Sequence, residues 1–271
     1  FFTVVVEEVN VAPVLTLPPG STNNELVAYS ANATATDADL PANTLTFELL
    51  SGPSGLTISP AGAINWTPTE AQGPDAYLVS VRVFDNGTPS LSHTQSFTLT
   101  VNEVNVAPEL TPIANYSINP GQTVAFTATA EDGDTPSNPL GFGLLPPTHG
   151  ATIDPNSGAF TWRSPMAAAN TTNSFTVRVV DGGAPALDAT QSFQVVVGPL
   201  LPVLLTPLAL SSAVYEFSVN GPVGPDYVFQ RSADFTNWTS FLTNTPVAMP
   251  ISVSDTNANA ARQFYRALLG P

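Results

Sequence analysis

The sequence predicts an all-β protein built from β-sandwich domains in tandem, and three observations support this prediction. Hydrophobic residues make up 43% of the 271 residues and charged residues only 10%, with 27 prolines and 18 glycines, which suits short strands and turns better than helices. Segments such as "SFTVRVV" alternate apolar and polar residues with the period of a strand. A whole set of these segments also occurs twice, at the spacing of one β-sandwich domain.

The repeat defines the expected domains. Pro13 and Pro108 stand in identical "NVAP" contexts 95 positions apart, and Phe193 follows Phe97 by 96 positions in a third copy of the same strand. Between these points "GAINWTP" matches "GAFTWRSP", and "VSVRVFDNGTPSLSHTQSF" matches "FTVRVVDGGAPALDATQSF". The expected organisation is an N-terminal strand and linker at 1–10, sandwiches at 11–104 and 105–200, and a smaller C-terminal β-sandwich domain at 201–271.

The sequence predicts strands and turns that alternate along the chain. "FFTVVV" reads as a strand, and the repeated "TFEL"-type and "NW"-type segments follow it, with turns at "SPAG" and "PNSG". Strand alternation predicts that Phe97, Leu99 and Val101 share one face, the core face. Trp66 and Trp162 recur at the same place in their repeats, which favours core filling over a ligand-binding cage.

Charge and residue usage narrow the class of protein. The net charge is −15 and the six basic residues are all scattered arginines, so nucleic acid is not an expected partner. Without cysteine there are no disulfides or thiolate metal sites, and without lysine there is no lysine–asparagine cross-link. No apolar run reaches the length of a membrane span, and no signal peptide precedes Phe1, so we expect a soluble mature chain or a fragment.

No catalytic constellation is visible, and we do not expect an enzyme. The two histidines, His93 and His149, have no equivalent in the other repeat and are interpreted as solvated loop residues. "SGPSG" at 51–55 lacks the spacing and the strand–turn–helix context of a nucleophile elbow, and is interpreted as a turn.

The residues quoted above carry a family resemblance. The two repeats resemble bacterial cadherin-like domains and the related dystroglycan-type and putative-Ig modules, with "WTPTEAQGPDAYLVSVRVFDNGTPSLSHTQSFTLTVNEVNVAP" close to that pattern. The resemblance implies tandem Ig-like or cadherin-like sandwiches in an extracellular or cell-surface protein. The last segment is similar to a small β-rich module at the C-termini of secreted bacterial proteins, through residues 232–234, Asn237, Trp238 and "FYRA".

The same resemblance implies calcium. In cadherins, cations lie at domain junctions, held by an acidic linker, a D-x-D pair, a following Asn and an Asp of the next domain. The corresponding positions of the first junction are Glu8, Asn10, Asp37, Asp39, Asn43 and Asp85. Those of the second junction are Glu103, Asn105, Asp132, Asp134, Asn138 and Asp181.

The sequence permits two interpretations of these residues, one with a bound cation and one without. The linker "NEVNVAP" is shorter than the cadherin pattern, and the sequence shows no counterpart of the acidic pair in the middle of the preceding domain, so we expect one cation per junction. The alternative interpretation needs no metal, because Asp and Asn side chains also cap backbone groups in turns.

The first residues suggest an assembly. In the repeat frame, residues 2–9 correspond to the final strand of a domain, and apolar side chains on such a strand favour pairing with a sheet edge elsewhere. We expect this strand to be donated to the C-terminal domain of a neighbouring copy, through an interface of Phe1, Phe2, Val4, Val5 and Val6. A head-to-tail contact of this kind would produce a filament of identical subunits.

Three alternatives stand beside the filament. The segment "RQFYRALLGP" could close the last domain from within the chain, which would weaken the case for donation. The chain could be part of a spacer or adhesion stalk, in which the first strand belongs to a preceding domain. It could also be a carbohydrate-binding module that recognises surface glycans through aromatic residues near Trp238.

Overall fold

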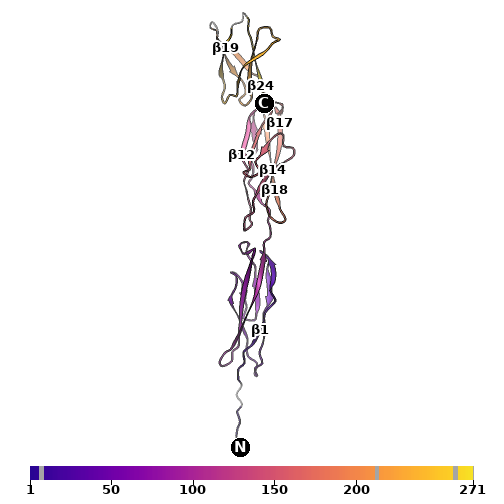
Figure 1. Ribbon diagram of the computed structural model, residues 1–271, viewed down its shortest axis with the longest axis vertical. Helices are drawn as coiled ribbons and strands as arrows, with labels where there is room; N and C mark the ends of the chain where they lie inside the picture. The colour runs from indigo at the N-terminus through magenta and orange to yellow at the C-terminus, as the bar shows by residue number, and fades with distance from the viewer. Residues whose placement is uncertain (6–8, 211–213, 259–261, 271) are drawn as a thin grey trace. The chain divides into compact units, whose positions relative to one another are not determined.

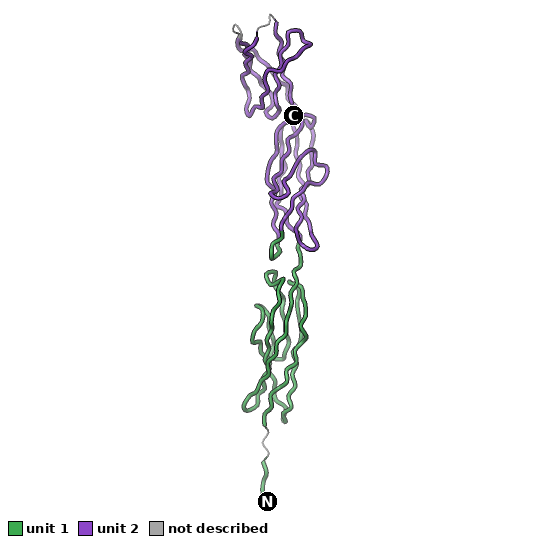
Figure 2. The backbone as a smooth tube through the Cα atoms, in the orientation of Figure 1, with its two compact units in different colours: residues 1–106, 133–138 green, residues 107–132, 139–271 purple. Residues whose placement is uncertain are grey.

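The computed structural model describes residues 1–5, 9–210, 214–258 and 262–270. It separates into two compact units, shown in Figure 2, and each is described by itself below. The first unit comprises residues 1–106 together with 133–138, and the second comprises residues 107–132 and 139–271. The structure is all-β apart from two short 3₁₀ helices within the described residues, which confirms the predicted fold class.

The first unit contains one β-sandwich. One sheet has the order β2-β9-β8-β5, in which β2 runs parallel to β9, and the other has the order β3-β7-β6, while β1 pairs with β4. The elements are β1 (Val14–Thr16), β2 (Ser21–Asn24), β3 (Tyr29–Asn32), β4 (Thr34–Thr36), β5 (Thr46–Ser51), β6 (Thr57–Ile58), β7 (Ala63–Trp66), η1 (Glu70–Gln72), β8 (Asp75–Phe84) and β9 (Ser92–Asn102).

The second unit begins with a sandwich of the same topology. Its sheets have the orders β11-β18-β17-β14 and β12-β16-β15, β10 pairs with β13, and β11 again runs parallel to the last strand. The elements, some of them labelled in Figure 1, are β10 (Glu109–Leu110), β11 (Tyr116–Ile118), β12 (Thr123–Thr127), β13 (Ala130–Glu131), β14 (Gly141–Leu145), β15 (Thr152–Ile153), β16 (Ala159–Arg163), η2 (Met166–Ala168), β17 (Thr171–Val180) and β18 (Asp188–Val197).

The second unit also holds the C-terminal sandwich. Its two sheets have three strands each, in the orders β19-β20-β23 and β22-β21-β24. The strands are β19 (Leu204–Leu210), β20 (Tyr215–Asn220), β21 (Asp226–Ser232), β22 (Thr239–Asn244), β23 (Ile251–Asp255) and β24 (Phe264–Gly270). The C-terminal segment therefore does supply a strand to its own domain, because β24 pairs antiparallel with β21.

The cores follow the predicted alternation. Phe97, Leu99 and Val101 point inward and are all buried, and Trp66 and Trp162 lie in the cores of the first and second sandwich. Each tryptophan donates its indole N–H to a loop carbonyl, 3.1 Å to Ser54 and 2.9 Å to His149. Burial with a satisfied donor is what core filling requires, so both residues are structural.

The two histidines lie in different environments. His93 is not a solvated loop residue: it lies within β9, is half-buried, and accepts a 3.0 Å hydrogen bond at Nδ1 from the backbone N–H of Leu15. The sequence missed this because β9 begins at Ser92, five residues before Phe97, where its apolar alternation starts. His149 is exposed, as predicted.

The described part of the N-terminal segment forms no strand with the rest of its own chain. Residues 1–5 and 9–13 have no secondary structure, and Phe1, Phe2, Val4 and Val5 are all exposed. Val6, Glu7 and Glu8 lie outside the described residues. No helix of the described chain is long and apolar enough to cross a membrane.

Candidate functional site

Three glutamates come together in the first unit. Glu25, Glu70 and Glu103 each place a carboxylate oxygen so that these three atoms all lie within 4.8 Å of one another. The strand pairing explains two of them: β2 and β9 are parallel and end opposite each other at Asn24 and Asn102, so the residues that follow emerge side by side. Glu70 is the first residue of η1, whose start is fixed by a capping box between Thr69 and Gln72.

Glu25 is the most constrained of the three. Its side chain is 1% exposed, and Oε1 accepts a 2.9 Å hydrogen bond from the backbone N–H of Val104. The other oxygen, Oε2, is buried and has no hydrogen-bond partner in the part of the chain that the structure describes. A Cβ on Gly73 would lie 2.4 Å from Oε2, so glycine at this position leaves room for the carboxylate. An ionised oxygen buried in this way is costly unless a cation compensates it.

The arrangement fits a hard cation. Three carboxylates at these distances repel one another by on the order of 3 kcal/mol per charged pair at an effective dielectric constant of about 20. Calcium prefers six to eight oxygen ligands, and the cluster offers up to six carboxylate oxygens. The backbone N–H of Thr135 also donates to Glu70 Oε1 at 3.2 Å, and residues 133–138 belong to this same unit.

The residues predicted for the first junction lie together, but mainly as a hydrogen-bond network. Asn43 Nδ2 donates to Asn10 Oδ1 at 2.9 Å and to Asp39 Oδ2 at 2.7 Å. Asn10 Nδ2 donates to Asp85 Oδ2 at 3.1 Å, and the backbone N–H of Asp39 donates to Asp37 Oδ1 at 3.0 Å. Asp37 Oδ2 is buried and, within the described residues, has no hydrogen-bond partner. Glu8 lies outside the described residues.

Asp85 shows how far turn capping accounts for this network. Its Oδ1 accepts backbone N–H bonds of 3.0 Å from both Gly87 and Leu91. Burial by itself raises the pKa of Asp85, but the N–H donors of Leu91 and Gly87 and the Asn10 amide outweigh it and lower the pKa below its ordinary value. The carboxylate is therefore stabilised by donors, as in a capped turn.

The residues predicted for the second junction repeat these bonds. Asn138 Nδ2 donates to Asn105 Oδ1 and to Asp134 Oδ2, each at 2.9 Å. The backbone N–H of Val106 donates to Asp134 Oδ1 at 2.9 Å. In the second unit, Asp181 Oδ1 accepts from Gly183 and Leu187, as Asp85 does from its own turn, and Asp132 follows β13. Glu103 alone of this set belongs to the glutamate cluster.

Comparison with known proteins supports the repeat assignment. The Putative Ig domain family matches residues 10–102 and again residues 107–198. The chain belongs to this family. No curated protein matches the chain.

Solved structures similar to this Ig-repeat protein are cadherin fragments. Mouse cadherin-23 EC22-24 is 23% identical with a TM-score of 0.48, and the match covers 72% of this chain and 67% of that one. Protocadherin gammaB7 EC3-6 is 17% identical with a TM-score of 0.47, covering 95% of this chain and 75% of that one. The protocadherin GammaB4 extracellular domain is 21% identical with a TM-score of 0.42, and the match covers 69% of this chain and 35% of that domain.

Sequence reasoning missed Glu25 and Glu70. Neither lies in the acidic segments that the two Ig repeats share, and the second repeat has Met166 where the first has Glu70 and Pro199 where the first has Glu103. A signal was nevertheless present: acids that occur in only one of two matching repeats cannot be explained as part of a duplicated turn.

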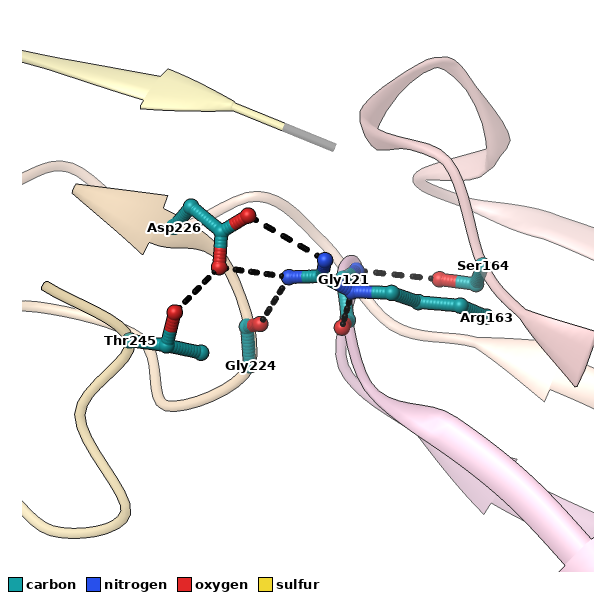
Figure 3. A network of polar contacts seen from close by, with 6 residues as sticks. All are labelled: Gly121, Arg163, Ser164, Gly224, Asp226 and Thr245. Carbon is teal, nitrogen blue, oxygen red and sulfur yellow. Dashed lines mark hydrogen bonds and ion pairs between the residues drawn. The ribbon is translucent and has the colours of Figure 1, made fainter. Parts of the chain in front are cut away.

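The second Ig repeat has no counterpart of Glu70 or Glu103, but it carries a network of hydrogen bonds and an ion pair centred on Arg163, shown in Figure 3. Arg163 at the end of β16 donates through Nε to Gly121 O at 2.9 Å and through Nη2 to Gly224 O at 3.2 Å. It also forms a two-pronged ion pair with Asp226, with bonds of 3.1 and 2.8 Å. The Thr245 hydroxyl donates to the same carboxylate at 2.5 Å. One side chain thus links the second Ig repeat to the C-terminal sandwich within the second unit.

Trp238 of the C-terminal sandwich is held by its neighbours. The Arg266 guanidinium lies 4.1 Å from the ring centroid, and the indole N–H donates to Phe235 O at 2.9 Å. Asp234 orders the same turn by accepting from Thr236 and Asn237, and hydrogen bonds led by that of the Asn237 backbone lower its pKa well below the ordinary value. Arg266 covers one face of the tryptophan, so packing accounts for that face.

Proposed function

We propose that this chain is a structural subunit of an extracellular surface fibre, in which calcium bound by Glu25, Glu70 and Glu103 orders the segment that follows the first Ig repeat. Tandem Ig-like sandwiches with no visible catalytic constellation suit a structural or adhesive role. The bound cation would tie the ends of β2 and β9 to η1 and to the residues that lead into the next repeat.

The buried Glu25 carboxylate carries this proposal. Its Oε2 atom has no hydrogen-bond partner among the described residues, and one oxygen of this carboxylate lies within 4.8 Å of an oxygen of each of the two other glutamates. The three carboxylates offer only oxygen ligands, which favour the hard cations calcium and magnesium over soft metals. Calcium is the better match because it accepts irregular carboxylate geometry, and extracellular modules bind it with dissociation constants of about 10⁻⁴–10⁻³ M.

Calorimetric titration of the purified chain with calcium chloride tests this function. We expect a saturable binding event for the unaltered chain, and its loss in Glu25→Gln, which keeps the shape and the acceptor for Val104. Glu109→Gln, at an exposed position in β10, is the matched control and should bind like the unaltered chain. A titration without saturable binding would leave the calcium site unsupported.

The exposed N-terminal segment is the basis of the proposed contact between subunits. Phe1, Phe2, Val4 and Val5 are exposed, although their sequence repeats that of β9 and β18. We infer that this segment pairs with the C-terminal sandwich of a neighbouring copy and that repetition of the contact builds a fibre. Negative-stain imaging distinguishes this from a spacer stalk: joined subunits give fibres that lengthen with concentration, and a stalk segment gives single particles.

A further inference from the structure

The C-terminal sandwich has an apolar groove between its two sheets. The groove has a volume of about 250 Å³. It is lined by Leu205 and Pro207 of β19, Tyr215 and Phe217 of β20, Phe264 and Tyr265 of β24, and Gln263 just before β24. Phe217 is a core residue with 2% of its surface exposed, so the groove reaches the edge of the hydrophobic core.

The groove lies where the C-terminal sandwich differs from the Ig repeats. In the Ig repeats the last strand is internal, because β9 pairs with both β2 and β8, and β18 pairs with both β11 and β17. In the C-terminal sandwich β24 is the edge of its sheet and pairs with β21, and β19 is the edge of the facing sheet and pairs with β20. Within the described residues, the outer edge of β24 is therefore open to a further strand.

The N-terminal segment has the side chains that such a strand needs. Aligned on the repeat, Phe2 corresponds to Phe97 and Phe193, which are 7% and 2% exposed in their own cores. Val4 corresponds in the same way to Leu99 and Val195, also buried. In the N-terminal segment, however, Phe2 is 92% exposed and Val4 is 71% exposed. The apolar face that fills two cores elsewhere in the chain is uncovered here.

We propose that the open edge of β24 and the groove beside it receive residues 1–5 of a second copy of this chain, with Phe2 and Val4 directed into the groove. This acceptor site rests on the proposed joining of subunits. The strand would run antiparallel to β24, as β9 runs to β8 and β18 to β17. Thr3 and Val5 then face away from the groove, because successive side chains of a strand point to opposite faces.

The charged residues near the two strands favour the antiparallel direction. An antiparallel strand places its later residues beside the start of β24, and the sequence continues there with Glu7 and Glu8. Arg262 is exposed just before β24 begins, in a chain that has only six basic residues in total. Opposite charges would therefore meet at this end of the donated strand, whereas the parallel direction would carry the two acids away from Arg262.

Four variants of the full chain, two in the donor segment and two at the acceptor, test the site by sedimentation velocity. Val4→Asp should remain monomeric because its donor face is polar, whereas Val5→Asp, one residue away on the other face, should associate like the unaltered chain. Leu205→Asp should be monomeric because its groove is blocked, with its fold checked by circular dichroism. Arg262→Glu leaves the core untouched and should weaken association measurably, most strongly at low salt.

Mixing the two blocked variants gives the sharpest result. Val4→Asp retains the groove and Leu205→Asp retains the donor, so a mixture should form one-to-one pairs and nothing larger. Association of Val4→Asp as strong as that of the unaltered chain would overturn the proposal. If Leu205→Asp and Arg262→Glu both still form fibres, the acceptor is elsewhere although subunits do join. If the unaltered chain never associates, joining itself fails, and the calcium titration stands independently of that outcome.

Discussion

Glu25 Oε1 accepts a 2.9 Å hydrogen bond from the backbone N–H of Val104, 79 residues further along the chain. This bond joins the end of β2 to the segment that leaves β9, at the level where the parallel ladder of the two strands stops. One oxygen of this carboxylate also lies within 4.8 Å of an oxygen of Glu70 and of Glu103. The fold thereby holds negative charges together that would separate in an open loop.

Glu25→Gln should have opposite effects on thermal stability with and without calcium. Without calcium, the substitution removes like-charge repulsion and should leave the melting temperature unchanged or raise it. With calcium at 100 times its dissociation constant, the unaltered chain gains about 2.7 kcal/mol from binding, and the variant should not. Differential scanning calorimetry in chelator and in calcium measures both effects, with Glu109→Gln again as the control. Lower stability of Glu25→Gln in chelator would indicate that the carboxylate is purely structural.

Arg163→Met should loosen the second unit independently of calcium. The substitution keeps most of the aliphatic stem but removes the ion pair with Asp226 and the bonds to Gly121 and Gly224. Because the pair is partly exposed, we expect a loss of only about 1 kcal/mol. Urea denaturation in chelator and in calcium should give the same loss. Arg178→Met, which removes a 3.0 Å ion pair with Asp188 inside one sheet, is the matched control.

Limited proteolysis separates these two arginines. Cleavage near residues 198–203, between β18 and β19, should accelerate in Arg163→Met and stay unchanged in Arg178→Met. The reason is that Arg163, unlike Arg178, links two sandwiches. Equal acceleration in both variants would mean that the network of Figure 3 contributes only general stability.

The Asp226 contact should weaken in acid. The hydrogen bond from Arg163, then that from Thr245, lowers the pKa of Asp226 below its ordinary value of 3.8. The folded state therefore binds this proton less readily than the unfolded state, so the contribution is complete above about pH 4 and is lost as the pH falls through the lowered pKa. Denaturation across this range should show a smaller acid-induced loss in Asp226→Asn. An identical pH profile in that variant would exclude the coupling.

The sequence could predict the sandwiches but only part of the candidate site. Phe97, Leu99 and Val101 reveal their common face by alternation alone, and Trp66 and Trp162 reveal theirs by recurring in both repeats. Glu25 and Glu70 could not be found in this way, because their proximity depends on a parallel pairing of β2 with β9 and on a short 3₁₀ helix. Neither feature leaves a periodic pattern in the sequence. The edge position of β24 is likewise a property of sheet order and not of any strand by itself.

A core substitution tests the burial pattern in the second Ig repeat. Phe193 packs against Phe175 with a centroid separation of 5.4 Å and against Phe160 at 5.3 Å, and all three are buried. Phe193→Ala should cost about 3–5 kcal/mol, because it removes a large side chain and leaves a cavity. Chemical denaturation followed by tryptophan fluorescence measures the loss. A cost below about 1 kcal/mol would mean that this core is not packed as described.

Tyr265, which lines the groove of the C-terminal sandwich, gives a pH-dependent signal of its own. Burial, followed by the nearby Asp255 carboxylate, raises the pKa of Tyr265 from 10.0 to about 12. Its hydroxyl donates a 3.2 Å hydrogen bond to Asp255 Oδ2, a bond that the ionised form cannot make. The folded state holds this proton more tightly than the unfolded state, so the stabilising contribution is complete below pH 10 and is lost as the pH rises toward 12. Ultraviolet titration of tyrosinate should show late ionisation whose amplitude Tyr265→Phe reduces and Tyr29→Phe leaves unchanged, with Tyr77 and Tyr227, whose pKa values burial also raises, contributing the remainder. An undiminished late amplitude in Tyr265→Phe would mean that this hydroxyl is not bound to Asp255.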